Sequence, residues 1–104
     1  MWEAVSLDSR KRQAIYLTEG LGHAFCALST TATVGYMCSE PYAPEREHGV
    51  HPLDPDLSIA WPEDLDLNLS PKDSTAPSLS AAAEAGLLPS WDACQDFTTR
   101  LAEW

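Results

Sequence analysis

The stretch HAFCALSTTATVGYMC, residues 23–38, decides the fold that the sequence predicts. Ser29-Thr30 divides it into two largely apolar runs, residues 23–28 and 31–38, and the second run is rich in β-branched and aromatic side chains. Two such runs separated by a short polar break are typical of neighbouring strands in an antiparallel sheet. This pair of runs therefore predicts β structure.

Two earlier segments extend the same pattern toward the N-terminus. The run at residues 2–7 ends at the polar turn of residues 8–12, and the run at residues 13–17 ends at residues 18–20, where Gly20 breaks it. Consecutive short strands joined by tight turns favour an antiparallel sandwich or barrel. Because side chains alternate along a strand, Tyr36 is expected to point into the barrel if Val34 and Cys38 line its inner face.

The segment from residue 39 to residue 77 is rich in proline and in acidic side chains. Its prolines exclude long regular elements. Leu57, Ile59, Trp61, Leu65 and Leu67 are apolar enough to pack against a core. Ordered loops that wrap over the domain are therefore expected here, and the acidic run at residues 63–66 is expected to be a solvated loop.

The C-terminal region changes to a helical pattern. Residues 78–86 predict a short helix with a serine or threonine N-cap and Gly86 as the C-terminal glycine. A second helix is expected from about Ser90 to Glu103, with Trp91, Cys94 and Leu101 at helical spacing. We accordingly divide the chain into a β region with wrapping loops, residues 1–77, and helices packed on the same domain, residues 78–104.

Composition narrows the classes of function. The 104 residues include six basic and sixteen acidic side chains, and the net charge of -10 argues against nucleic acids and anionic membrane surfaces as partners. Three scattered cysteines do not form a disulfide framework, and neither a signal peptide nor a membrane span is recognisable. A cytoplasmic protein is expected.

Several collinear segments resemble the C-terminal half of the dTDP-4-dehydrorhamnose 3,5-epimerase family. They are Gly20–Phe25, Thr33–Tyr36, Tyr42–Val50, Asp54–Pro62, Leu69–Asp73 and Ala76–Leu79. The resemblance implies a mainly β fold, a partial cupin-type jelly-roll barrel with a proline-rich wrapping segment and two short C-terminal helices. It also implies a homodimer that needs neither a metal nor an organic cofactor.

The resemblance further implies a reaction: epimerisation at C3 and C5 of a dTDP-linked 4-keto-6-deoxy sugar, as in rhamnose and other deoxysugar biosynthesis. Both carbons adjoin the C4 ketone, so a base can remove a proton from one face and an acid can return one to the other. By position, Tyr36 matches the catalytic acid and Asp73 matches the aspartate that pairs with the base histidine. The substrate-binding positions are His23, Tyr42, Arg46, Glu47 and Lys72.

The family's base histidine, its enolate-stabilising lysine and its main phosphate-binding arginines have no counterpart in this sequence. An inactive polypeptide that only binds sugar nucleotides or dimerises is therefore the alternative to an epimerase. The alternative interpretation of Tyr36 is a barrel-core tyrosine, and that of Asp73 is a capping carboxylate after Ser70-Pro71. His48 and His51 lie near Glu45, Glu47 and Asp54, but their spacing matches no strong metal-ligand signature.

Overall fold

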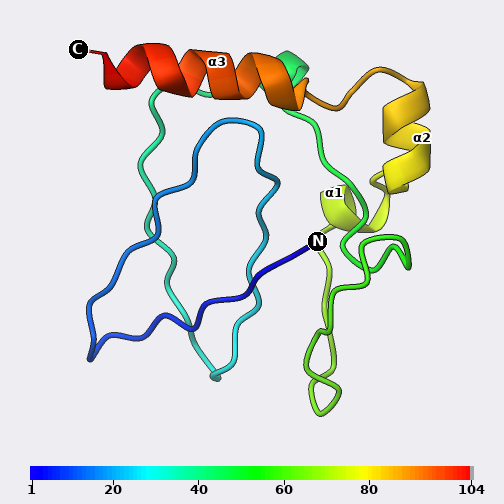
Figure 1. Cartoon of the computed structure of the whole chain (residues 1–104). Helices are drawn as coiled ribbons and strands as arrows, with labels where there is room; N and C mark the ends of the chain where they lie inside the picture. Colours follow the sequence, from blue (N-terminus) through cyan, green and yellow to red (C-terminus); the bar gives the residue numbers. More distant parts are fainter. Residues whose placement is uncertain (104) are drawn as a thin grey trace.

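The computed structural model describes residues 1–103, which contain four short helical elements joined by extended chain. These are a 3-10 helix, η1 (Pro44–Arg46), and three α-helices, α1 (Pro71–Ser74), α2 (Leu79–Glu84) and α3 (Trp91–Ala102). Residues 1–42 pass back and forth below α3, and residues 50–86 form a second part that carries α1 and α2 (Figure 1). No helix within residues 1–103 has the length and apolar character needed to cross a membrane.

The prediction of a mainly β, partial jelly-roll fold is wrong for this structure. Residues 1–103 contain no β-strand, although residues 21–28 and 32–38 are drawn as extended passes (Figure 1). A strand requires a neighbour about 4.8 Å away that exchanges backbone hydrogen bonds with it. No backbone hydrogen bond joins residues 13–42, which we call the extended region, to another described segment. The β-forming side chains therefore produce extended backbone without a sheet.

The turns between the extended passes form where polar residues and glycine were expected to break them. Asp8 caps the first turn, since its carboxylate accepts hydrogen bonds from the backbone N–H groups of Arg10 at 2.9 Å and Lys11 at 2.8 Å. Such bonds to nearby backbone are the usual reason that aspartate favours turns. The second turn contains Gly20, whose φ of 91° lies in the left-handed region that glycine tolerates best.

Two tryptophans fix the wrapping segment. The Trp61 indole N–H donates to the carbonyl of Pro52 at 2.8 Å, and the Trp2 indole N–H donates to the carbonyl of Ser58 at 2.7 Å. The second bond ties the N-terminal segment to a loop 56 residues away. Leu57, Ile59, Leu65 and Leu67 are half-buried here, in agreement with ordered loops rather than free chain.

Local capping defines α2, which lies within the predicted residues 78–86. The Ser78 hydroxyl accepts from the backbone N–H of Ala81 at 3.1 Å, and Gly86 follows the helix with a φ of 70°. The N–H of Leu87 donates to the carbonyl of Ala82, and that of Gly86 donates to Ala83. This pair of bonds is the Schellman arrangement, which satisfies the last carbonyls of a helix.

The helix α3 begins close to the predicted start at Ser90, whose hydroxyl accepts from the N–H of Ala93 at 3.3 Å. Its half-buried residues are Cys94, Gln95 and Thr98, and the Thr98 hydroxyl donates to the Glu19 carboxylate at 3.4 Å. The apolar residues Trp91, Phe97 and Leu101 of this helix stay 53%, 43% and 45% exposed.

The interior of the described chain is small. Ala82 is the only fully buried residue among residues 1–103. The radius of gyration is 15.4 Å, against about 13 Å for a compact domain of this length. The accessible surface is 9490 Å², whereas a folded monomer of this mass exposes about 5,800 Å². The chain therefore leaves much more surface exposed than a typical independent domain.

We predict that Gly20→Ala lowers the free energy of unfolding by about 1–3 kcal/mol. A Cβ at Gly20 would meet the Cys94 Cβ at 3.0 Å and the Trp91 ring at 3.2 Å, in addition to the strain of a positive φ. Urea denaturation followed by far-UV circular dichroism measures the change. Gly22→Ala is the control, since a Cβ there meets nothing within 4 Å. Equal losses in the two variants would contradict the proposed contact between Gly20 and α3.

Candidate functional site

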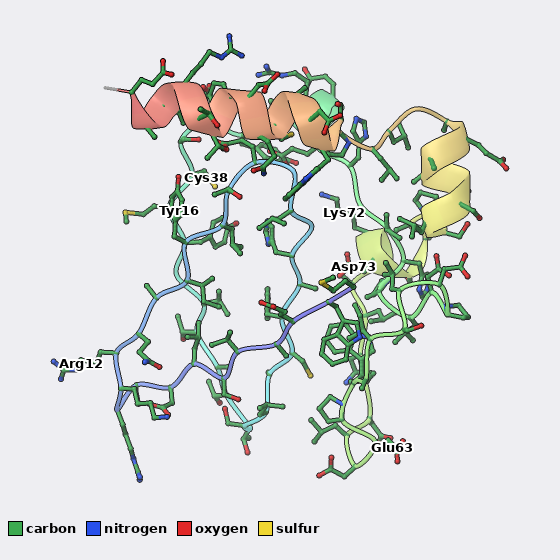
Figure 2. The ribbon with its side chains drawn as sticks, viewed as in Figure 1. Arg12, Tyr16, Cys38, Glu63, Lys72 and Asp73 are labelled. Carbon is green, nitrogen blue, oxygen red and sulfur yellow. The ribbon has the colours of Figure 1, made fainter. Side chains whose placement is uncertain are left out.

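The helix α1 presents two predicted site residues, Lys72 and Asp73, from a single turn (Figure 2). The Ser70 hydroxyl accepts from the backbone N–H of Asp73 at 3.1 Å, and Pro71 occupies the first turn, where its missing N–H costs nothing. At the other end, the Thr75 hydroxyl donates to the carbonyl of Pro71 at 2.8 Å. Ser70 and Thr75 thereby fix the direction of a helix only four residues long.

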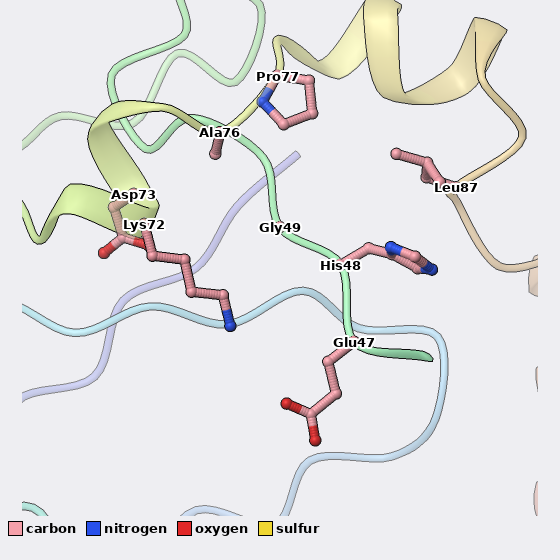
Figure 3. Close-up of a pocket in the computed structure, with 8 residues that line it drawn as sticks. All are labelled: Glu47, His48, Gly49, Lys72, Asp73, Ala76, Pro77 and Leu87. Atoms are coloured by element: carbon pink, nitrogen blue, oxygen red, sulfur yellow. The ribbon is translucent and has the colours of Figure 1, made fainter. Parts of the chain in front are cut away.

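A shallow pocket of about 200 Å³ lies between α1, the chain after η1 and the connector after α2. Its walls combine one cation, two carboxylates and one imidazole with small and apolar groups. The lining residues are Glu47, His48, Gly49, Lys72, Asp73, Ala76, Pro77 and Leu87 (Figure 3). Lys72 reaches across the pocket from α1, while the His48 imidazole points toward Leu87 (Figure 3).

Three of the predicted site residues meet in this pocket: Glu47, Lys72 and Asp73. Four others do not line it: His23, Tyr36, Tyr42 and Arg46. Tyr36 lies in the extended region, apart from α1 in the sequence, and is 81% exposed. Tyr42 is 76% exposed, and Arg46 ends η1 beside Glu47. Tyr36, the predicted acid, and Asp73, the aspartate predicted to pair with the base histidine, therefore do not share a cavity within the described chain.

Glu47 is held partly by its own segment, since its carboxylate accepts from the backbone N–H of Ala43 at 3.2 Å. This bond spans η1 and keeps the acidic group close to the turn that carries Arg46. Lys72 lines the pocket, whereas Arg46 does not. The Lys72 ammonium suits an anionic ligand.

Sequence reasoning did not assign His48 to the substrate site, although the structure places it in the pocket wall. In the sequence, His48 matches neither the family's base histidine nor a strong metal-ligand signature. Its position directly after Glu47 was the available signal, because neighbouring loop residues can line one hollow when the backbone between elements turns. Within residues 1–103, His, Cys, Asp and Glu side chains form no group of three or more that could hold a metal ion.

The loop at residues 51–54 fixes the wall of the pocket formed by Pro77. The backbone N–H of His51 donates to the carbonyl of Pro77 at 2.8 Å. The Asp54 carboxylate accepts from the N–H of Leu79 at 2.6 Å and from that of Asp56 at 3.1 Å. These two bonds, that from Leu79 first, hold the pKa of Asp54 below its ordinary value of 3.8. Asp54 thus caps α2 from 25 residues away.

A larger hollow, of about 400 Å³, lies along α3 against Asp96, Thr99 and Arg100. All three residues belong to one helix, so the hollow has no wall from a second element. None of the predicted site residues lies there. The pocket beside α1 is therefore the better candidate site, although it is the smaller of the two.

Comparison with known proteins connects the pocket and the extended region with one family. A family model described as dTDP-4-dehydrorhamnose 3,5-epimerase matches residues 1–81. A dTDP-4-dehydrorhamnose 3,5-epimerase from Mycolicibacterium smegmatis is 54% identical over 100 residues, which are 96% of this chain and 49% of the relative. A dTDP-4-dehydro-6-deoxyglucose 3-epimerase from Streptomyces bikiniensis is 53% identical over 95 residues, 91% of this chain and 48% of that protein.

The solved structures that resemble this chain are also sugar-nucleotide epimerases. The crystal structure of ChmJ, a 3'-monoepimerase from Streptomyces bikiniensis in complex with dTDP-quinovose, aligns with a TM-score of 0.57 and 52% identity. The alignment covers 62% of this chain and 32% of that chain. A double mutant of ChmJ in complex with dTDP, with one histidine changed to asparagine and one tyrosine to phenylalanine, aligns with a TM-score of 0.54.

The relatives are sugar-nucleotide epimerases as a class. The present chain belongs to the dTDP-4-dehydrorhamnose 3,5-epimerase family. It spans about half the length of the curated relatives that it matches, and the matched part is their C-terminal half. The resemblance inferred from the sequence is thereby confirmed.

We predict that the Leu79 amide reports the titration of Asp54. Because the pKa of Asp54 is lowered in the folded chain, its contribution to stability is complete above the ordinary value of 3.8 and is lost as the pH falls through the lowered pKa. The amide chemical shift of Leu79, followed by NMR, should show a midpoint below 3.8. The titration should vanish in Asp54→Asn and persist in Asp56→Asn. A midpoint at or above 3.8 would contradict the capping bond.

Proposed function

We propose that the chain supplies the proton-donor half of an epimerase site for dTDP-linked 4-keto-6-deoxy sugars. The observation that carries the proposal is family membership over residues 1–81, a range that includes Tyr36, Glu47, Lys72 and Asp73. The relatives include both 3,5-epimerases and a 3-epimerase, so the proposal covers exchange at one carbon or at both.

The proposed chemistry is deprotonation and reprotonation beside the C4 ketone. Removal of the proton at C3 or C5 gives an enolate whose charge rests on the C4 oxygen. Tyr36 then donates its phenolic proton to the opposite face of the ring, which inverts the carbon. A phenol suits this step because its ordinary pKa of about 10 keeps it protonated at neutral pH.

The remaining residues have proposed roles in binding and orientation. Asp73 fixes the tautomer of a base histidine that no residue of this sequence matches. Lys72 and Arg46 attract the anionic part of the sugar nucleotide, and His23, Tyr42 and Glu47 contact its polar groups. The proposed site acts as a homodimer in the cytoplasm, and the chemistry requires no cofactor. The free cysteines Cys26, Cys38 and Cys94 are compatible with a reducing compartment.

A specific observation favours the second candidate, an inactive binding or dimerisation protein, for the chain acting alone. Tyr36 is 81% exposed and does not line the pocket that contains Lys72 and Asp73. An exposed phenol can exchange its proton with water rather than deliver it to one face of a bound sugar. We therefore expect the isolated chain to bind sugar nucleotide weakly and to catalyse no proton exchange.

We predict deuterium exchange when this chain replaces the matching half of the Mycolicibacterium smegmatis relative in a single polypeptide. With a dTDP-4-keto-6-deoxy sugar in deuterated water, deuterium should appear at C3, at C5 or at both. Tyr36→Phe should slow the exchange by about 10²–10⁴-fold, because the acid is lost. NMR of the recovered sugar measures the rate.

Tyr16→Phe is the matched control for this experiment. Tyr16 and Tyr36 are each 81% exposed, and both lie in the extended region. Exchange in the Tyr16 variant should equal that of the unmodified chimaera. Equal rates in the Tyr36 variant and its parent would remove Tyr36 from the mechanism, and absence of exchange in a folded chimaera would contradict the proposed function.

A further inference from the structure

The extended region, residues 13–42, carries most of the exposed large apolar side chains among residues 1–103. They are Ile15, Tyr16, Leu17, Leu21, Phe25, Leu28, Val34, Tyr36, Met37 and Tyr42, with exposures from 45% for Leu17 to 101% for Met37. Many exposed apolar side chains in one segment are typical of an interaction site in soluble proteins. The region is therefore a candidate interface and not an ordinary surface loop.

The distribution of charged residues also supports an interface in the extended region. Glu19 and Glu40 are the only acidic residues between positions 13 and 42, and no lysine or arginine lies there. The chain as a whole carries a net charge of -10. Depletion of charge at the centre of a patch, with charged residues around it, is the composition that distinguishes the core of a protein interface.

The surface that the whole chain leaves exposed in excess of a compact monomer is larger than one standard interface. The accessible surface of 9490 Å² exceeds that of a folded monomer of this mass by about 3,700 Å². A standard interface buries only about 800 Å² on each partner. Since the backbone of residues 13–42 also forms no hydrogen bonds with other described segments, an occupant must supply polar partners as well as apolar cover.

We propose that the extended region is the docking surface for a polypeptide equivalent to the N-terminal half of the family relatives, and that this polypeptide can bind in trans. The chain matches only 49% of the Mycolicibacterium smegmatis relative, so a complement of similar size exists within that protein. A second copy of this chain is the alternative occupant of this surface.

The test mixes the 104-residue chain with the separately purified N-terminal half of the Mycolicibacterium smegmatis relative. Light scattering after size exclusion should show a one-to-one complex. Alkylation of Cys38, followed by peptide mass spectrometry, should slow at least about tenfold in the complex, because this thiol is exposed and lies in the extended region.

Two substitutions locate the interface. Val34→Asp introduces a charge into the extended region and should weaken association at least about tenfold by calorimetry. Leu88→Asp is the matched control, since Leu88 is 41% exposed and Val34 is 48% exposed, but Leu88 lies outside the region. Its affinity should equal that of the unmodified chain.

Three results would overturn the proposal: no complex, a complex in which Cys38 reacts at its original rate, or equal weakening by both substitutions. Self-association of the chain with the same protection of Cys38 would assign the surface to a second copy and would also overturn it. None of these measurements requires turnover. A complex that forms but exchanges no deuterium would therefore contradict the proposed function and leave the docking surface intact.

Discussion

A backbone amide that leaves water needs a hydrogen-bond partner, and this requirement governs the whole structure. The helices meet it internally and with serine caps, as Ser78 and Ser90 show. The extended region has β-forming side chains but no partner segment among residues 1–103, so its backbone and its apolar side chains both face solvent. The interior is small, the surface is large and Tyr36 lies apart from the pocket because the extended region has no segment with which to share backbone hydrogen bonds.

Helices find their hydrogen-bond partners nearby in the sequence and strands do not, and this difference explains which elements the sequence could predict. The bounds of α2 and α3 follow from local signals, a serine before each helix and Gly86 after α2, and those signals act within a few residues. The polar turn capped by Asp8 is local too. A strand depends on a neighbour that may be distant in the sequence, so residues 31–38 could predict extended backbone but not the sheet.

The candidate site shows a similar division. Lys72 and Asp73 lie together because Ser70 and Pro71 start a helix at that point, and the sequence contained those signals. Their proximity to Glu47 and His48 depends on how distant loops are held, by the bonds from His51 to Pro77 and from Leu79 to Asp54. Tyr36 has no comparable anchor. Its predicted role came from family resemblance, and the described chain places its side chain in solvent and not in a pocket.

Amide hydrogen exchange of the isolated chain tests the central claim most directly. If residues 13–42 have no backbone partner, their amides should exchange within about tenfold of unstructured peptide rates, while amides in the middle of α3 are slower. Tandem mass spectrometry resolves the two regions in one experiment. Strong, cooperative protection of residues 13–42 in the monomeric chain would show that their hydrogen bonds are already satisfied, and would contradict the account.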